Sequence, residues 1–463
     1  METGIILTGF VVALAFVLIS IIKFDLHPFL ALLFGGIIMG AIAGLDLLSI
    51  AEGLATGFGN TMAGIGILII LGIILGELLH QSGSMEEIAN LFIRNLGKKR
   101  IPEAMNLTGY IISIPVFFDA AFVILVNLAK SLSRKAKIPF VTLVTALAVG
   151  LIITHGMVIP TPGPVAVADT MGANVGWFIF YGVIASLIGA TVGGVLYGKY
   201  LGKTDEFKDN FAQDFEDDEE KVNVSIDGEK VENRPSGGLG IALILLPILL
   251  ILIGTIFTMF LEEGSFSYTL AAFVGDKNIA LLVGVVVAYF ALRKYLDNSF
   301  NEIISESTTS AGSILAITGA GGAFGSIINM SGIGDVIVSS LDNVSGSSSG
   351  VVIILFAFLV SALLRMAQGS TTVALVTTSA IFAPVVASLT GVSGILVGLA
   401  ICAGGAGFSL PNDSGFWVVS RFANFDVKQT IKAWTIPASI ASITALGVVV
   451  LLSFFTSFLP GLL

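Results

Sequence analysis

The sequence predicts an all-α polytopic membrane protein built from two inverted repeats. The chain has 463 residues, a mean hydropathy of +0.98, 55% hydrophobic residues and only 12% charged residues. Soluble domains carry about 25% charged residues. Apolar runs of about 20 residues, the length that crosses a bilayer as a helix, recur from end to end. This composition leaves no room for a soluble catalytic domain.

Short motifs recur at an offset of 249 positions (331 − 82), at which Ser331-Gly332 repeat Ser82-Gly83. Some such identities arise by chance in a glycine-rich chain, so the basic residues weigh more. The cluster Lys98-Lys99-Arg100 corresponds to three serines, 347–349. Connections rich in Lys and Arg tend to stay in the cytoplasm. Since the second copy lacks these charges at the equivalent connection, it is expected to have the opposite orientation in the membrane. The other pairs at this offset are Gly72 with Gly321, Gly76 with Gly325 and Pro162 with Pro411.

The first repeat is expected at residues 1–202. Within it, residues 102–131 have basic clusters at both ends, so both ends should be cytoplasmic. About 30 residues are too few to cross a bilayer twice, so they predict a re-entrant hairpin. Its tip is expected at Ser113–Asp119, where Pro115 interrupts helical hydrogen bonding. The other predicted elements are helices at about 5–22, 28–45, 60–80 and 175–198, an amphipathic stretch from Met85 to Leu96, and a crossing at 139–172 that is broken between His155 and Pro164.

An acidic segment, 203–236, separates the repeats and is expected to be a solvated cytoplasmic linker. A partner-binding role for this segment is the alternative. The second repeat is expected at 237–463, and the whole chain at about ten crossings and two hairpins. Its predicted elements are helices near 239–261, 278–292, 309–329 and 433–459, a hairpin at 351–385 and a broken helix at 388–421.

Four breaks in these helices are expected to converge at membrane depth. Each would leave backbone amides or carbonyls without intrahelical partners, and such backbone is tolerated only inside protein or beside a water-filled cavity. The N-termini of half-helices attract anions through their free amides and their dipole. The sequence therefore predicts an anion site where the breaks meet. The breaks are Ser113 to Asp119, His155 to Pro164, Ala367 to Thr372 and Ser409 to Phe416.

Arg365 lies about fourteen residues into the second hairpin, and an intramembrane arginine indicates a functional site by default. Its planar guanidinium could bind the carboxylate of a substrate. The alternative is a structural ion pair with Asp119 or Asp413.

The remaining polar residues near the breaks complete the predicted site. Asp119 and Asp413 are candidate binding residues for a coupling ion, and the alternative for each is a helix-capping carboxylate. His155 titrates near neutral pH, and its alternative is a buried histidine satisfied by a backbone group. The full set of predicted substrate-binding residues is Asp119, His155, Thr161, Gly163, Arg365, Gln368, Gly369, Ser370, Thr371, Asn412, Asp413 and Ser414.

Several classes of protein are excluded or disfavoured. The only cysteine, Cys402, rules out an internal disulfide and a cysteine-based metal cage. The glycine-rich run 319–325 lacks the Lys-Ser/Thr of a phosphate loop and is expected to permit close helix packing. No ATPase or hydrolase motif is present, so we expect no enzyme, cofactor, metal or nucleic-acid partner. Inverted repeats with broken helices are typical of secondary transporters, so a transporter is expected. A channel, which would pass a solute without concentrating it, is the alternative.

The motifs at the breaks, taken together and in order, resemble the gluconate permease (GntP) family of the ion transporter superfamily. They are Gly57–Thr61, Ile114–Asp119, Thr154–Gly156, Pro162–Pro164, Gly332–Asp335, Leu364–Ser370 and Asn412–Trp417. The resemblance implies proton-coupled uptake of gluconate-like sugar acids, or of D-serine or glycerate, across the bacterial cytoplasmic membrane. It also implies a homodimer of the elevator type.

Two departures from that family's pattern bear on the coupling ion. Thr161 stands where the family often has histidine, and Leu410-Pro411 stand where it often has His-Val. Sodium therefore remains the alternative to the proton.

Overall fold

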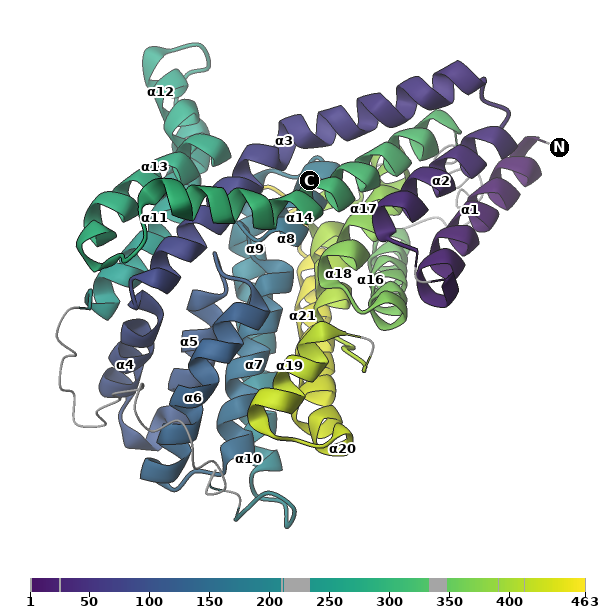
Figure 1. Ribbon diagram of the computed structural model, residues 1–463. Helices are drawn as coiled ribbons and strands as arrows, with labels where there is room; N and C mark the ends of the chain where they lie inside the picture. Colours follow the sequence, from purple (N-terminus) through teal and green to yellow (C-terminus); the bar gives the residue numbers. More distant parts are fainter. Residues whose placement is uncertain are drawn as a thin grey trace.

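The computed structural model describes residues 2–24, 26–209, 211, 234–332, 348–389, 391–411 and 413–462. Over these residues the chain forms helices and no strands (Figure 1). The first half contains α1 (Glu2–Phe24), α2 (Pro28–Ile42), α3 (Leu47–Gln81), α4 (Ser84–Leu96), η1 (Lys98–Arg100), α5 (Ile101–Ile112), α6 (Phe118–Ala136), α7 (Phe140–Met157), α8 (Pro162–Thr170), α9 (Val175–Gly189), the π-helical η2 (Ala190–Leu196) and α10 (Tyr197–Leu201).

The second half repeats this order of elements. It contains α11 (Gly237–Thr258), α12 (Phe266–Gly275), α13 (Lys277–Leu292), η3 (Arg293–Tyr295), α14 (Phe300–Met330), α16 (Ser348–Gln368), α17 (Thr371–Ser388), α18 (Gly394–Ala406), α19 (Ser414–Ala423), α20 (Val427–Thr430), the π-helical η4 (Ile431–Thr435) and α21 (Ile436–Ser453). Each half thus has a long helix, a helix pair, an interrupted helix and a final helix with a π-helical segment.

The interrupted helices of the two halves run in opposite directions. In Figure 1, α8 lies above α7, whereas α19 lies below α18. The helices α7 and α18 also contact each other: a Cβ on Gly156 of α7 would lie 2.6 Å from the Cβ of Ala406 in α18. Opposite directions are what an inverted repeat requires. The all-helical, many-span prediction is confirmed.

Eight of the described helices, with adjoining segments joined, are long and apolar enough to cross a membrane. Two predicted crossings appear instead as shorter apolar helices: α2 and α18. By contrast, α17, which the sequence predicts as one arm of a hairpin, is itself long enough to span. The eight are Leu47–Gln81, Phe140–Thr170, Val175–Leu201, Gly237–Thr258, Lys277–Tyr295, Phe300–Met330, Thr371–Ser388 and Val427–Ser453.

The long helix α3 begins at Leu47, not near residue 60 as predicted. Glycines such as Gly53 and Gly57 lower helix propensity, so the local sequence does not favour a helix here. The same glycines let α3 approach α14 closely. A Cβ on Gly57 would lie 2.5 Å from the carbonyl oxygen of Gly322. Packing between the two long helices therefore outweighs propensity. For the same reason α14 begins at Phe300, ahead of the predicted residue 309.

The glycines Gly76 and Gly325, which correspond in the two repeats, face the predicted hairpins. On α3, a Cβ on Gly76 would lie 2.4 Å from the carbonyl oxygen of Pro115, between α5 and α6. On α14, a Cβ on Gly325 would lie 3.3 Å from the Cβ of Ala380 in α17. Residues related by the sequence repeat thus have related packing roles. The predicted role of the glycine-rich run in close helix packing is confirmed.

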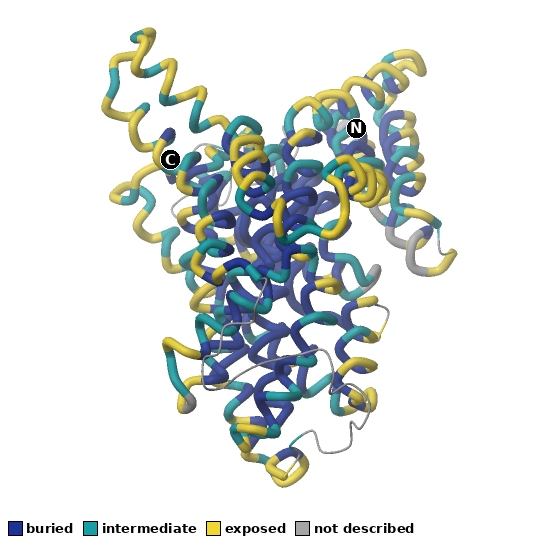
Figure 2. Tube along the Cα trace, turned by 60° about the vertical axis from the view of Figure 1, so that its left-hand side comes forward, coloured by how far each residue is buried: buried dark blue, intermediate teal, exposed yellow. Residues whose placement is uncertain are grey.

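The most deeply buried part of the chain lies at the centre of the helix bundle (Figure 2). Every residue of α7 is buried, as are most residues of α17 and α18. Exposed apolar side chains such as Phe260 and Phe290 lie at the periphery, as expected for a surface that faces lipid. Most of the predicted acidic linker, 210 and 212–233, lies outside the described residues.

Candidate functional site

A cavity of about 170 Å³ lies where the interrupted helices meet. It receives residues from both halves of the chain and from each of the four predicted breaks or their margins. The lining residues are Phe118, Asp119, Ile152, His155, Arg365, Gly369, Ser370, Thr371, Thr372, Asp413, Ser414, Gly415 and Trp434.

Three helices begin at this cavity. Residues of the first turn of α6, α17 and α19 all line it. Ser370 is the N-cap of α17, and its hydroxyl oxygen accepts the amide of Val373 at 3.4 Å. Asp413 is the N-cap of α19. Three sets of N-terminal amides, together with the dipoles behind them, favour a negatively charged ligand.

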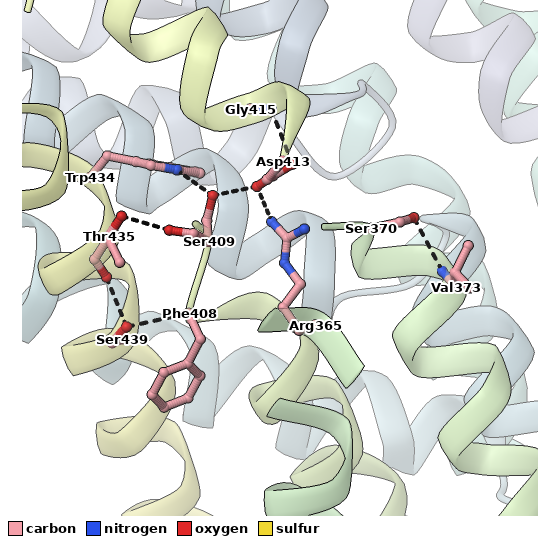
Figure 3. A network of polar contacts seen from close by, with 10 residues as sticks. All are labelled: Arg365, Ser370, Val373, Phe408, Ser409, Asp413, Gly415, Trp434, Thr435 and Ser439. Atoms are coloured by element: carbon pink, nitrogen blue, oxygen red, sulfur yellow. Dashed lines mark hydrogen bonds and ion pairs between the residues drawn. The ribbon is translucent and has the colours of Figure 1, made fainter. Parts of the chain in front are cut away.

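Arg365 lies at the end of α16 with 2% of its side chain exposed. Its Nη2 donates to Oδ2 of Asp413, which forms a buried ion pair (Figure 3). Its Nε and Nη1 have no hydrogen-bond partner among the described residues. Unpaired buried donors of a charged group are costly, so these two nitrogens are groups that a ligand can satisfy.

Asp413 is held by several groups besides Arg365. The amide of Gly415 donates to its Oδ1 at 3.1 Å, and the hydroxyl of Ser409 donates to its Oδ2. Ser409 in turn accepts a hydrogen bond of 2.6 Å from the indole nitrogen of Trp434. Figure 3 shows this chain of contacts running from Trp434 to Arg365. Asp413 therefore has both of the structural roles that were predicted as alternatives: it caps a helix and it pairs with Arg365.

Asp119 has a different environment. It lies in the first turn of α6 and is exposed to the cavity. Its carboxylate is close to Ser414 and within electrostatic range of Asp413 and Arg365. A carboxylate at a helix N-terminus is favoured by the dipole. Both carboxylates line the cavity, but Asp119 is exposed whereas Asp413 is buried and held by other groups.

His155 lies near the end of α7 and is 8% exposed. Its ring centroid is 5.7 Å from that of Phe117. Its Nδ1 has no hydrogen-bond partner among the described residues, so the described backbone does not satisfy this nitrogen. A ligand with a hydroxyl or amino group could supply the missing partner.

Two predicted site residues do not line the cavity. The hydroxyl of Thr161 donates to the carbonyl oxygen of Val158. Gly163 packs against α17, where a Cβ would lie 2.9 Å from Leu375. Asn412 and the side chain of Gln368 lie outside the described residues. The other predicted residues, Asp119, His155, Arg365, Gly369, Ser370, Thr371, Asp413 and Ser414, line the cavity together.

Sequence reasoning missed two lining residues, of which Trp434 is the more informative. It is fully buried, and its ring centroid lies 4.7 Å from that of Phe118. Trp434 belongs to the π-helical segment η4, a feature often found at functional sites. The only nearby signal in the sequence is Pro437, which interrupts helical hydrogen bonding three residues later. Ile152 was also missed, whereas Phe118, Thr372 and Gly415 line the cavity from within the predicted breaks.

A family model described as "GntP family permease" matches residues 5–455. The chain belongs to the GntP family of permeases. A gluconate permease of Pseudomonas aeruginosa is 31% identical to this chain, and the match covers 94% of this chain and 95% of the permease. The D-serine transporter DsdX of Escherichia coli is 32% identical over 97% of this chain and 98% of the transporter. An uncharacterized permease of Haemophilus influenzae is 36% identical over 94% of this chain and 89% of that permease.

The fold is also similar to a solved structure, the YdaH transporter of Alcanivorax borkumensis, described as having an unusual topology. The TM-score is 0.68 at 17% identity, covering 94% of this chain and all of the other. This likeness concerns the fold alone. Membership of the GntP family, with the apolar helices, makes the protein a multi-pass transporter of the bacterial cytoplasmic membrane, not a catalyst.

Proposed function

We propose that this permease imports a small hydroxylated organic acid, whose carboxylate binds Arg365 in the central cavity. The observation that carries the proposal is the buried guanidinium, whose Nε and Nη1 lack partners among the described residues. Three helix N-termini surround the same cavity and add to its attraction for an anion. Arg365 suits a carboxylate because its planar donors match the two oxygens.

Hydroxyl groups and one imidazole would bind the rest of the substrate. Ser370, Thr371, Thr372 and Ser414 line the cavity with groups that donate and accept hydrogen bonds. His155 lines the same cavity with an unpaired nitrogen. A chain bearing hydroxyls next to its carboxylate, as in sugar acids, would satisfy these groups together.

The lining of the cavity also suits a second candidate beside gluconate. A three-carbon acid such as glycerate, or D-serine, carries the same carboxylate together with hydroxyl or amino groups that the cavity residues could bind. Relatives named for gluconate and for D-serine make both compounds reasonable substrates to test.

We propose that a proton enters with the substrate at Asp119, with sodium as the alternative ion. Uptake of an anion against an inside-negative potential requires at least one co-transported cation. Asp413 is already occupied by Arg365, Ser409 and Gly415. Asp119 faces the cavity and has room for a cation. This assigns the coupling ion to the first repeat and the substrate carboxylate to the second.

We also propose alternating access of the elevator type in a homodimer. The interrupted helices would move against outer helices such as α11 and α13.

In this conformation Lys277 of α13 forms an ion pair of 3.0 Å with Asp169 of α8. Cysteines at 169 and 277, in a Cys402→Ala background, would cross-link these elements. We expect the cross-link to stop transport and spare binding, and reduction to restore transport. Full transport by the cross-linked protein would contradict the elevator motion.

A thermal-shift screen tests the substrate proposal. A ligand that binds only the folded protein at about 100 times its Kd stabilises it by about 2.7 kcal/mol. Gluconate, glycerate and D-serine are the test ligands, and glycerol is the matched control without a carboxylate. We expect stabilisation by at least one acid and none by glycerol. Equal stabilisation by glycerol, or none by any acid, would contradict carboxylate binding.

A further inference from the structure

The ion pair between Arg365 and Asp413 uses only one oxygen of the carboxylate. An arginine and a carboxylate that meet in a buried site commonly pair through two parallel hydrogen bonds. Here Nη2 of Arg365 contacts Oδ2 of Asp413, while Nε and Nη1 have no partner among the described residues. Arg365 therefore retains unused donors although its counter-ion touches it.

The other donors to Asp413 explain this geometry. The amide of Gly415 holds Oδ1, and the hydroxyl of Ser409 holds Oδ2, the oxygen that also contacts Arg365. Turning the carboxylate to offer both oxygens to Arg365 would break these bonds. The plane of the carboxylate is thus fixed by groups other than the arginine.

Ser409 is itself held in place by the last helix of the second repeat. The indole nitrogen of Trp434 donates to its hydroxyl oxygen at 2.6 Å, and the hydroxyl of Thr435 donates to its carbonyl oxygen at 2.6 Å. Since Trp434 has only a donor to offer, the proton of Ser409 is directed elsewhere, to Asp413. Packing against Phe118 holds the indole itself.

We propose that Ser409 and Trp434 are positioning residues that keep this ion pair monodentate and so hold Arg365 ready for a substrate carboxylate. The inference rests on the proposed function at Arg365. Without the two residues, Asp413 turns to pair with Arg365 through both oxygens. Arg365 is then satisfied internally, and the substrate must displace an internal partner to bind.

The test is the double variant Ser409→Ala/Trp434→Phe. Removing both members of the bond avoids leaving the indole donor buried and unpaired, a defect that by itself destabilises a protein. The matched control is Trp177→Phe, because Trp177 packs on Tyr181 and Phe180 away from the cavity. Affinity for gluconate, glycerate and D-serine is measured by titration calorimetry, and the melting temperature by thermal shift without ligand.

We expect the double variant to bind the acid about tenfold more weakly, a loss of about 1.4 kcal/mol. Its melting temperature should be no lower than that of a Trp434→Phe single variant, which leaves the same space in the core, because Arg365 gains a bond. Unchanged affinity would overturn the inference, and so would weaker binding with a matching loss of stability. Equal binding by wild type and Arg365→Gln would overturn the proposed function instead.

Discussion

The first repeat supplies the cavity with an exposed carboxylate, Asp119, and with His155, whose Nδ1 has no hydrogen-bond partner among the described residues. The second supplies the charged pair Arg365 and Asp413, together with the hydroxyls that follow Gly369. Both repeats bring the start of a helix to the same place. Repetition of the fold therefore builds the anion-attracting frame, and differences in sequence give the two halves separate tasks within it.

The final helices of the repeats differ in a similar way. Both contain a π-helical segment, η2 in the first repeat and η4 in the second. In the first, the side-chain amide of Asn106 donates to the carbonyl oxygen of Ala190 at 3.2 Å and to that of Ala146 at 2.7 Å. In the second, Trp434 donates toward the cavity. The π-helical segment of the first repeat therefore takes part in helix packing, whereas that of the second repeat contributes Trp434 to the site.

The largest effect is expected from Arg365→Lys, which tests the task given to the second repeat. A lysine keeps the charge but cannot reproduce the planar set of donors. We expect affinity for the acid to fall about 30- to 100-fold, in line with the loss of hydrogen bonds to a charged group. Calorimetry measures it, with Arg421→Lys on the exposed side of α19 as the control. Wild-type affinity in a folded Arg365→Lys protein would remove Arg365 from substrate binding.

The next effect concerns Asp119→Asn, which tests the task given to the first repeat. If Asp119 carries the coupling ion, the variant should lose concentrative uptake but retain exchange of labelled for unlabelled acid. Asp413→Asn should instead alter the affinity for the acid, because it removes the carboxylate that pairs with Arg365. Counterflow and gradient-driven uptake in proteoliposomes separate the two. Concentrative uptake by Asp119→Asn would break the proposed division of tasks.

A smaller effect is expected from His155→Ala. A single hydrogen bond between neutral groups contributes about 0.5–1.5 kcal/mol, so affinity should fall about two- to tenfold. The loss should be confined to acids that carry a hydroxyl or amino group beside the carboxylate. Lactate and propionate form a matched pair for calorimetry. An equal loss for both acids would mean that His155 does not bind the hydroxyl.

The smallest effect concerns the starts of the long helices α3 and α14. Asp46 caps α3, and Ser299 with Glu302 forms a capping box on α14. A hydrogen bond from the Ser49 hydroxyl, then those from the amides of Leu48 and Ser49, lower the pKa of Asp46. A lowered pKa means that the cap is present above about pH 4, the usual pKa of Asp, and is lost as the pH falls through the folded-state value.

We therefore expect Asp46→Ala to speed hydrogen exchange in the first turn of α3 about three- to tenfold at neutral pH. Ser299→Ala should do the same for α14 only. Exchange mass spectrometry measures both. Unchanged exchange at α3 would show that packing against α14, not the cap, holds its start.

The sequence revealed the parts of the site that depend on helix-breaking residues and on buried charge. Pro115 and Gly369 mark interruptions because a regular helix does not continue through them, and Arg365 stands out in an apolar segment. The partner of Arg365 could not be chosen, since Asp119 and Asp413 are both near breaks and only the fold decides which one touches it. Thr161 was expected at the site, but its hydroxyl bonds to its own turn.

Other features depend on contacts that no local pattern contains. Trp434 lies in a continuous run of helix just before Pro437, and its contacts with Ser409 and Phe118 come from distant parts of the chain. The early start of α3 depends on Gly57 meeting Gly322, more than two hundred and fifty positions later. Helix propensity alone points the other way at these glycines. The position of Trp434 and the start of α3 therefore depend on tertiary packing, which the local sequence does not show.

Uptake by purified protein in liposomes tests the central claim most directly. Labelled glycerate, gluconate or D-serine is presented with an inside-negative potential and an inward proton gradient, with sodium absent. We predict saturable accumulation above the outside concentration for at least one acid, abolished by a protonophore and by Arg365→Gln. Accumulation driven by a sodium gradient alone would reassign the ion. Flux that never exceeds equilibrium, or that persists in Arg365→Gln, would contradict the account.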